Sequence, residues 1–262
     1  MMRYLRVYRA IIRSNFIGEM THRTNFIMGF FSGILYLLTG LGLFLVVFLR
    51  LSMFGDWNAG DMFIFVGTTY LIDVVWMTFF FFNMLGMPEK INSGKFDLLL
   101  TKPLNTQFLV TCERINLESG FNSLIGIGLI VYGIYIAGYD VTVVSLLTYL
   151  FLLANGVMLF YSTFLMINCI AFWQTKFKFA WDLIEWFYEF AMKPDVIYRG
   201  SVRFILTYFL PAMMLVSFPA RALMGKLDLS EVLWGLLATT ILFVACQWVW
   251  KRAIANYTSA SS

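Results

Sequence analysis

Long apolar runs separated by short polar segments dominate this chain. Each run has about the 20 residues that a helix needs to cross a hydrocarbon core roughly 30 Å thick, and each carries few charges. The pattern predicts an all-α, polytopic membrane protein that forms a single transmembrane domain over residues 1–262. We expect six membrane-spanning helices, at residues 25–49, 62–87, 118–138, 143–172, 204–220 and 231–250.

The first 20 residues follow an amphipathic pattern instead. Arg3, Arg6, Arg9 and Arg13 recur at helical spacing on one side of a helical wheel, and apolar side chains fill the opposite side. This predicts that residues 1–20 form an interfacial helix lying along the membrane. A soluble amphipathic helix packed on a partner is the alternative. The repeated arginines exclude a signal peptide, whose apolar region would stand there.

Lysines and arginines are unevenly distributed between the two sides of the predicted bundle. Of the 19, 16 lie in four segments that six spans place on one side, namely residues 1–24, 88–117, 173–203 and 251–262. The other side holds Arg50, Arg221 and Lys226. Because basic residues are retained in the cytoplasm, we expect a multi-pass protein of the cell membrane with both termini cytoplasmic. Its outer loops are short, so no large external domain is expected.

The segment 173–203 carries several charges among apolar residues. Asp182, Glu185 and Glu189 lie at spacings of three and four and share one helical face. Each charge near the bilayer centre costs about 2.5–3.5 kcal/mol on insertion scales. We therefore expect this segment to be a cytoplasmic interfacial helix that ends at Pro194.

Two prolines interrupt the fifth predicted span. Pro211 and Pro219 stand within the apolar run, and Arg221 follows in the sequence FPARALMG. A proline frees a backbone carbonyl that only protein or water can satisfy inside a membrane. The sequence predicts a kinked or re-entrant helix, broken at these prolines and covered by protein near the outer surface.

No catalytic or cofactor-binding constellation is visible in the sequence. It has one histidine, three scattered cysteines and no GxSxG, HExxH or glycine-rich GK[ST] motif. We therefore expect neither an enzyme nor a metal site, and no ATP bound by this chain. A net charge of +4 without a basic block argues against nucleic acid as a partner. Because 60% of the residues are hydrophobic, we expect lipid and other proteins as the partners.

Asp73 is the acid well inside a predicted span, in the sequence TTYLIDVVWM. An ionisable residue within a membrane is a functional hypothesis by default. The alternative is a packing role, in which Asp73 accepts hydrogen bonds from Thr68, Thr69 or a neighbouring helix.

Glycines recur in and beside the first and third predicted spans. Small residues let membrane helices approach closely, so eight glycines are interpreted as packing positions: Gly29, Gly33, Gly40, Gly42, Gly120, Gly126, Gly128 and Gly133.

The loop 88–105, PEKINSGKFDLLLTKPLN, joins the second and third predicted spans. It is too long for a minimal turn and too apolar for a free linker. Pro88 and Glu89 can begin a short helix, and the sequence Asn92-Ser93-Gly94 favours a turn. We expect this apolar surface to dock in a groove on another protein, although its leucines could instead dip into the membrane interface. The candidate contact residues are Glu89, Lys90, Ile91, Gly94, Phe96, Asp97, Leu98, Leu99 and Leu100.

Together these features resemble the ABC-2 type permeases, in particular the small antibiotic and multidrug export permeases. The resemblance rests on the amphipathic N-terminal helix, the six spans, the loop INSGKFDLLLTKPLN and the proline-broken sequence LTYFLPAMMLVSFPARALMG. It implies an ABC-2 exporter-like fold, a dimer with a second permease copy or a paralogue, and a coupling helix within Glu89 to Leu100 that contacts separate ATP-binding cassette ATPase subunits. ATP and Mg would bind in those subunits. The exported solute would be amphipathic or apolar, such as an antibiotic or a lipid-like compound.

Two other classes of protein remain open. An ion-coupled secondary transporter would use Asp73, but it usually has paired ionisable groups near the midplane and an internal repeat. A non-transport membrane scaffold would have no dependence on ATP. Copurification with a soluble P-loop protein distinguishes the ABC permease from both.

Overall fold

The computed structural model describes residues 2–21, 23–48, 56–174 and 178–257. This part of the chain is helical and has no strand, as the sequence predicts. Its longer helices are α1 (Met2–Thr21), α2 (Arg23–Phe48), α3 (Ala59–Trp76), α9 (Ser123–Ala137), α10 (Val143–Asn168), α11 (Lys178–Ala191), α13 (Met213–Leu223) and α14 (Leu229–Ala255). Shorter helices are α4 (Phe82–Leu85), α5 (Met87–Asn92), α6 (Asp97–Leu100), α7 (Thr106–Cys112), α8 (Leu117–Phe121) and α12 (Gly200–Phe204). Two π-helical turns, η1 (Met77–Phe81) and η4 (Ile205–Phe209), and two 3-10 turns, η2 (Cys169–Phe172) and η3 (Asp195–Ile197), continue or link them.

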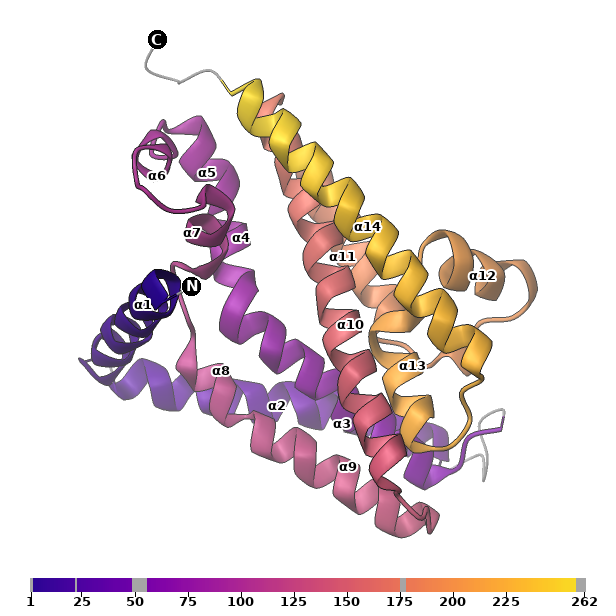
Figure 1. Ribbon diagram of the computed structural model, residues 1–262. Coiled ribbons are helices and arrows are strands. Elements are labelled where there is room, and N and C mark those ends of the chain that lie inside the picture. The colour runs from indigo at the N-terminus through magenta and orange to yellow at the C-terminus, as the bar shows by residue number, and fades with distance from the viewer. Residues whose placement is uncertain (1, 22, 49–55, 175–177, 258–262) are drawn as a thin grey trace.

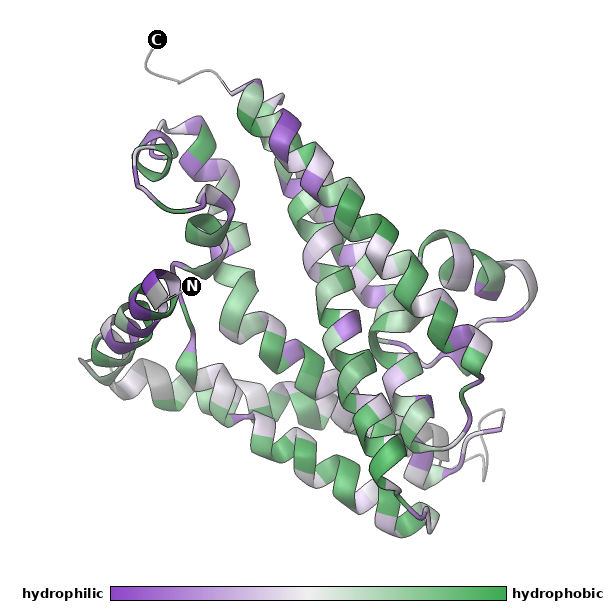
Figure 2. Ribbon diagram, in the orientation of Figure 1, coloured by the Kyte–Doolittle hydropathy of each residue, from purple (hydrophilic) through white to green (hydrophobic). Residues whose placement is uncertain are grey.

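The helices form two packed groups (Figure 1). In one, α3 packs along α9 and beside α2; in the other, α10 packs on α13 and α14, and α13 also contacts α3. We call the end of the molecule that holds α5, α6 and the end of α14 the coupling end. The distal end holds the start of α3, the loop after α9 and the start of α14. Hydrophobic residues cover most of α9, α10 and α14 (Figure 2).

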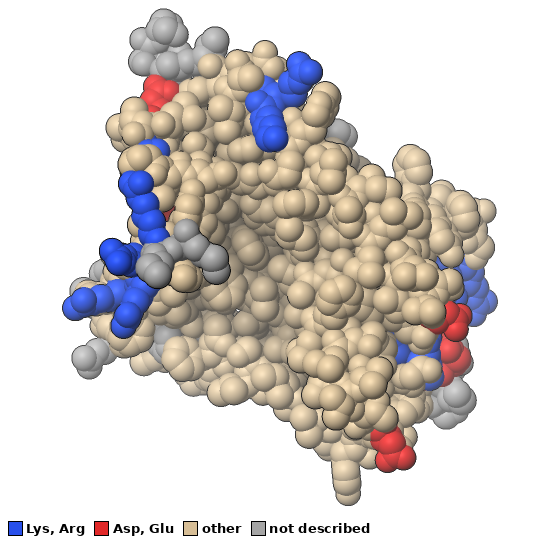
Figure 3. Space-filling view, viewed as in Figure 1, with Lys and Arg blue, Asp and Glu red and all other residues tan. Residues whose placement is uncertain are grey.

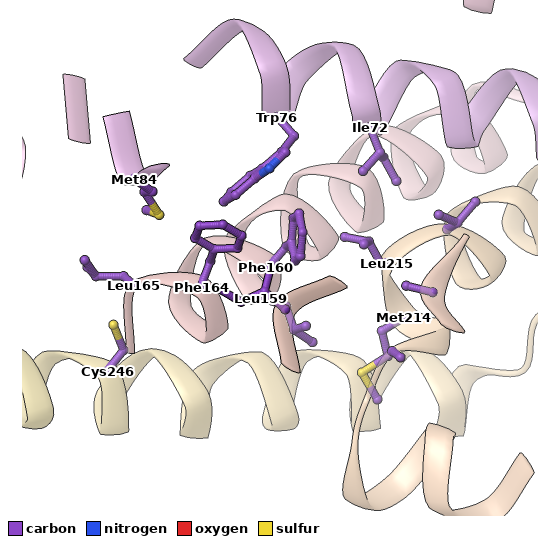
Figure 4. Close-up of a cluster of buried hydrophobic side chains, with 14 of the residues drawn as sticks. Ile72, Trp76, Met84, Leu159, Phe160, Phe164, Leu165, Met214, Leu215 and Cys246 are labelled. Carbon is purple, nitrogen blue, oxygen red and sulfur yellow. The ribbon is translucent and has the colours of Figure 1, made fainter. Parts of the chain in front are cut away.

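An aromatic cluster joins the two groups (Figure 4). The buried Trp76 ring on α3 lies 4.2 Å from Phe160 and 4.7 Å from Phe164, both on α10. Leu165 and Cys246 are buried further along the same cluster. Lipid tails are as apolar as these side chains, so close van der Waals packing, rather than exclusion of water, stabilises the contact.

Glycines bring α3 and α9 into backbone contact. A Cβ atom at Gly67 would lie 2.8 Å from the Gly126 carbonyl oxygen, and one at Gly133 would lie 2.7 Å from that of Gly60. The two pairs are seven residues apart on both helices, so they repeat on one face. The packing interpretation is thus confirmed for Gly126 and Gly133, whereas three predicted positions face open space: Gly40, Gly42 and Gly128.

In the part of the chain that the structure describes, four helical stretches are long and apolar enough to cross a membrane: Ala59–Asn92, Ser119–Ala137, Val143–Phe172 and Leu229–Ala255. They correspond to the second, third, fourth and sixth predicted spans. Within the described residues, α2 adds a shorter apolar stretch, Ile27–Gly42. The fifth predicted span is instead a pair of helices, Gly200–Phe209 and Met213–Leu223, bent by 98°.

The bend falls at Pro211, where η4 has ended and α13 has not begun. The predicted break is therefore confirmed there, but it is wrong at Pro219, which lies inside α13. Asp195 contacts both arms of the bent pair, Arg203 of α12 at 2.9 Å and Arg221 of α13 at 3.5 Å. Both arms thus return to the distal end, which is the geometry of a re-entrant element.

The prediction that residues 173–203 stay at the cytoplasmic surface is wrong. Just before this segment, the Phe172 ring lies 5.1 Å from Phe96 at the coupling end. Just after α11, the Asp195 backbone N–H donates to Ser217 Oγ, and its carboxylate contacts Arg221 at the distal end. The chain therefore passes from one end of the bundle to the other through α11.

Packing of the other face of α11 explains this placement. Ile184 and Ala191 are buried, and the Phe187 ring stacks on Phe160 at 6.0 Å. The acids Asp182 and Glu185 face outward. Because α11 runs from one end of the bundle to the other, Lys193, Arg199 and Arg203 lie at the distal end. Among the described residues, the lysines and arginines then divide 12 to 5, still in favour of the coupling end.

Candidate coupling surface and solute pocket

The predicted contact loop is anchored by its aromatic residue. Phe96 is fully buried, and its ring meets those of Phe172 at 5.1 Å, Tyr257 at 5.2 Å and Trp250 at 6.4 Å. Aromatic pairs of this kind stabilise by about 0.5–1.5 kcal/mol each beyond their buried area. The loop is therefore fastened to the end of α14.

The apolar residues of this loop divide between two faces. Ile91 and Leu99 are buried with Phe96, whereas the side chain of Leu98 is 67% exposed and that of Leu100 is 39% exposed. The prediction that all the leucines form one docking surface is thus wrong for Leu99. We call Leu98, Leu100 and the exposed Glu89 the coupling surface.

Local sequence rules explain the shape of the loop. Pro88 stands in the first turn of α5, and Ser93 ends that helix, as predicted. Gly94 has φ +74°, a left-handed conformation that glycine adopts without strain. Lys90 pairs with Glu113 beyond the loop, in a partly exposed ion pair of the kind worth about 0–1 kcal/mol. Asp97 begins α6.

Helix α1 lies against the element that follows the coupling surface. The Tyr4 ring meets Phe108 of α7 edge-on at 5.2 Å, and the Asn105 backbone N–H donates to the Tyr4 hydroxyl at 3.2 Å. The predicted arginines, Arg3, Arg6, Arg9 and Arg13, are all exposed. Leu5 and Ile17 are also exposed, at 62% and 57%. Residues 2–21 are helical, and the prediction that this helix lies in the membrane interface stays a prediction.

A lateral cleft of about 610 Å³ separates α1 and α7 from α10 and α14. In Figure 3, this hollowed face is almost free of charge, with basic residues over α1 on one side and at the end of α14 on the other. On its wall the Gln107 side-chain amide donates to the Tyr161 hydroxyl at 2.9 Å. The cleft keeps α1 and α7 out of close packing against α14 on this side.

A hinge-like connection lies between α3 and the coupling surface. The π-helical turn Met77–Phe81 interrupts the helix, a feature frequent at functional sites. Just beyond it, the Asn83 side chain donates to the Arg114 carbonyl at 2.7 Å and accepts from the Arg114 N–H at 2.8 Å. These two hydrogen bonds to the backbone hold both ends of the loop together, and they were not predicted from the sequence.

Asp73 faces a pocket of about 350 Å³ between α2, α3, α8 and α11. Its carboxylate accepts a hydrogen bond from the Tyr188 hydroxyl of α11. The predicted donors Thr68 and Thr69 donate to the carbonyls of Ile64 and Phe65 instead. Of the two predicted sources of a hydrogen bond to Asp73, the structure therefore shows the neighbouring helix.

Two polar side chains stand in the wall of this pocket. The Tyr70 hydroxyl and Asn122 Oδ1 are buried and have no hydrogen-bond partner. Gly33 makes room for both, because a Cβ atom there would overlap the Asn122 amide and lie 3.1 Å from the Tyr70 oxygen. A second pocket, of about 160 Å³, shares Tyr36 and Tyr70 and continues along α2 and α3. The polar atoms of Tyr70 and Asn122 thus stand within walls that are otherwise mostly apolar.

Buried charges join the elements of the distal end. The fully buried Asp61 binds Lys226 Nζ at 2.8 Å and accepts from the Tyr139 hydroxyl at 2.6 Å. Arg221 pairs with Glu231 at 2.7 Å. Burial raises the pKa of the Asp195 carboxyl, and the guanidinium of Arg221, with that of Arg203, opposes this shift. The N-cap patterns NAGD and DLSE in the sequence could have indicated Asp61 and Glu231.

The described part of the chain offers no group of three histidine, cysteine, aspartate or glutamate side chains that could hold a metal ion. Long apolar helices, an acid that faces a pocket between them and an exposed loop at one end define a multi-pass membrane protein.

The chain belongs to the ABC-2 transporter family. The family model described as ABC-2 family transporter protein matches residues 34–261. Members of this family are membrane translocation components, and they generally work with an ATP-binding subunit. No curated protein and no solved structure matches the chain.

Proposed function

We propose that this chain is the permease subunit of an ATP-binding cassette exporter. Two permease copies, or one copy and a paralogue, enclose the translocation path. A separate ATPase subunit binds ATP and Mg and contacts the coupling surface. The exported solute is amphipathic, and both termini are cytoplasmic.

The observation that carries this proposal is the exposure of Leu98 and Leu100 on an anchored loop. Exposed leucines at a loop tip are unfavourable in water unless a partner covers them. Here Phe96 holds the loop against α14, so force on the exposed leucines is transmitted to that helix rather than lost in loop motion. A rigid apolar tip of this kind suits insertion into a groove on the ATPase subunit.

The acidic face of α11 supports a second permease copy. Charged residues within membrane-crossing segments face protein or a water-filled cavity, because lipid cannot solvate them. Asp182, Glu185 and Glu189 are exposed in the single chain. We therefore place this face towards an aqueous path that the second copy closes.

The connection between the coupling surface and the bundle supports a mechanical cycle. Closure of the ATPase subunits pushes the loop, and the Asn83–Arg114 link and the π-helical turn transmit this push to α3. Because α1 packs on α7 through Tyr4, it moves with the loop across the lateral cleft. Such motions alternate the path between inward-open and outward-open states.

Purification of the tagged chain in mild detergent from its native cells tests the proposal. We expect a stoichiometric P-loop subunit, identified by mass spectrometry, together with ATP hydrolysis in the eluate. A chain that purifies alone, without ATP hydrolysis, would contradict the proposal and favour ion-coupled transport through Asp73, whose pocket inside the bundle is the observation that favours this second candidate.

A further inference from the structure

Asp73 has no basic partner among the described residues. Those that line its pocket include no lysine or arginine, and the described ion pairs do not include Asp73. An acid at this depth in a membrane bundle is costly unless it is paired. The Tyr188 hydroxyl gives it one hydrogen bond but no opposite charge.

Aromatic rings surround the same space. Tyr36 of α2, Tyr70 of α3 and Tyr188 of α11 all line the pocket with Asp73. A cation is attracted to the face of an aromatic ring, and cages of aromatic residues recognise quaternary ammonium groups. A carboxylate within such a set provides the opposite charge, which a neutral apolar solute would not need.

The pocket also has polar atoms without partners. Tyr70 is 3% exposed and Asn122 is 4% exposed, yet the Tyr70 hydroxyl and Asn122 Oδ1 form no hydrogen bond. Buried polar atoms in native proteins almost always have partners. Both atoms meet at Gly33, where the missing side chain leaves them room. These are features of a site for a polar group that the chain itself does not supply.

Further acids stand on the helix that closes the pocket. Asp182 and Glu185 are exposed on α11, and Glu189, which is also exposed, pairs with Lys193. Surfaces of one charge raise the local concentration of ions of the opposite charge. A solute that approaches along α11 towards Asp73 is therefore selected for positive charge.

We propose that the Asp73 pocket binds an organic ammonium ion, with its charged group beside the Asp73 carboxylate and its apolar body among Tyr36, Tyr70 and Tyr188. The pocket volume of about 350 Å³ lies at the lower end of the range for small-molecule sites. This inference rests on the proposed function and names its solute class, an amphipathic cation.

Binding of radiolabelled phenyltrimethylammonium to the purified chain, without nucleotide, tests the inference by equilibrium dialysis. We expect saturable binding that Asp73→Asn weakens at least about tenfold, because a contact with a charged group is lost. The neutral isostere tert-butylbenzene should not displace the label. Asp140→Asn, an exposed acid in the loop after α9, is the matched control and should bind as the wild type does.

Two further variants keep the test independent of folding defects at Asp73. Gly33→Ala forces Asn122 and Tyr70 to move and should also weaken binding. Gly128→Ala, at a glycine that faces open space, is the matched control and should bind as the wild type does. Equal binding by the wild type, Asp73→Asn and Gly33→Ala, or equal displacement by the neutral isostere, would overturn the inference.

The outcome also separates this inference from the proposed function. If the chain copurifies with an active ATPase but binds no ammonium ion, the exporter proposal stands and the proposed solute class is wrong. If the chain binds the ammonium ion through Asp73 but has no ATPase partner, the proposed ammonium site stands and the exporter proposal is wrong.

Discussion

The ring of Phe96 meets the ring of Tyr257 edge-on, with 5.2 Å between their centroids. This contact joins the loop before α6 to the segment just beyond α14, although 160 residues of sequence separate the two rings. It makes the coupling surface part of the bundle rather than a free loop.

Phe96→Ala should release the loop. Truncation of a fully buried phenylalanine costs about 3–5 kcal/mol, so the loop should open more often and trypsin should cleave after the exposed Lys95 at least about a hundredfold faster. Phe209→Ala is the control, because that side chain is 81% exposed. An unchanged cleavage rate in the Phe96 variant would show that other contacts hold the loop.

The path of α11 predicts the accessibility of Arg199. Cys169 and Cys246 are buried, so only Cys112 needs replacement by serine. A cysteine introduced at Arg199 should then react with a membrane-impermeant maleimide from the same side as one at Asp140, and from the opposite side to one at Lys95. All three positions are exposed. If Arg199→Cys were labelled from the same side as Lys95→Cys, residues 173–203 would lie at the coupling end.

The charges at the distal end predict a large effect of Asp195→Asn. Removing one partner of a buried ion pair typically costs about 3–5 kcal/mol. We expect the lower end of that range, because Arg221 keeps Glu231 as a partner. Lys193→Gln, which breaks an exposed pair with Glu189, should cost at most about 1 kcal/mol. Thermal unfolding in detergent measures both, and similar losses would mean that burial does not strengthen the network.

The glycine contacts predict that Gly133→Ala is harmful and Gly128→Ala is not. The added methyl group at Gly133 meets the Gly60 carbonyl, and overpacking of this kind costs about 1–3 kcal/mol. Gly128 faces open space, so alanine there should stabilise the helix by about 0.5–1 kcal/mol. Equal unfolding temperatures of the two variants would argue against close packing of α3 on α9.

Much of the bundle is predictable because each long helix carries its own apolar run. Helices α3, α9, α10 and α14 follow the expected spans closely, and the turn at Gly94 follows from local residue preferences. Helix α11 was mistaken for a surface helix because its acids are visible in the sequence, whereas the partner that buries its other face, Phe160, is not. Likewise, no local pattern pairs Asp73 with Tyr188, because they are 115 residues apart.

Contacts also decide which loop residues can act on a partner. The sequence presents Leu98, Leu99 and Leu100 as equivalent, but the short helix α6 turns Leu99 inward and leaves its neighbours outside. A variant of Leu99 would therefore disturb the loop itself. Only substitutions at Leu98 and Leu100 separate contact with the partner from loop stability.

The most direct test of the permease assignment is the rate of ATP hydrolysis by the reconstituted complex of this chain with its ATPase subunit. Leu98→Asp combined with Leu100→Asp should abolish the stimulation that the permease gives, because charges replace the apolar contact, while Leu229→Asp, an exposed leucine at the distal end, should leave it unchanged. Full stimulation in the double variant, with the loop intact to trypsin, would contradict the coupling role of this surface.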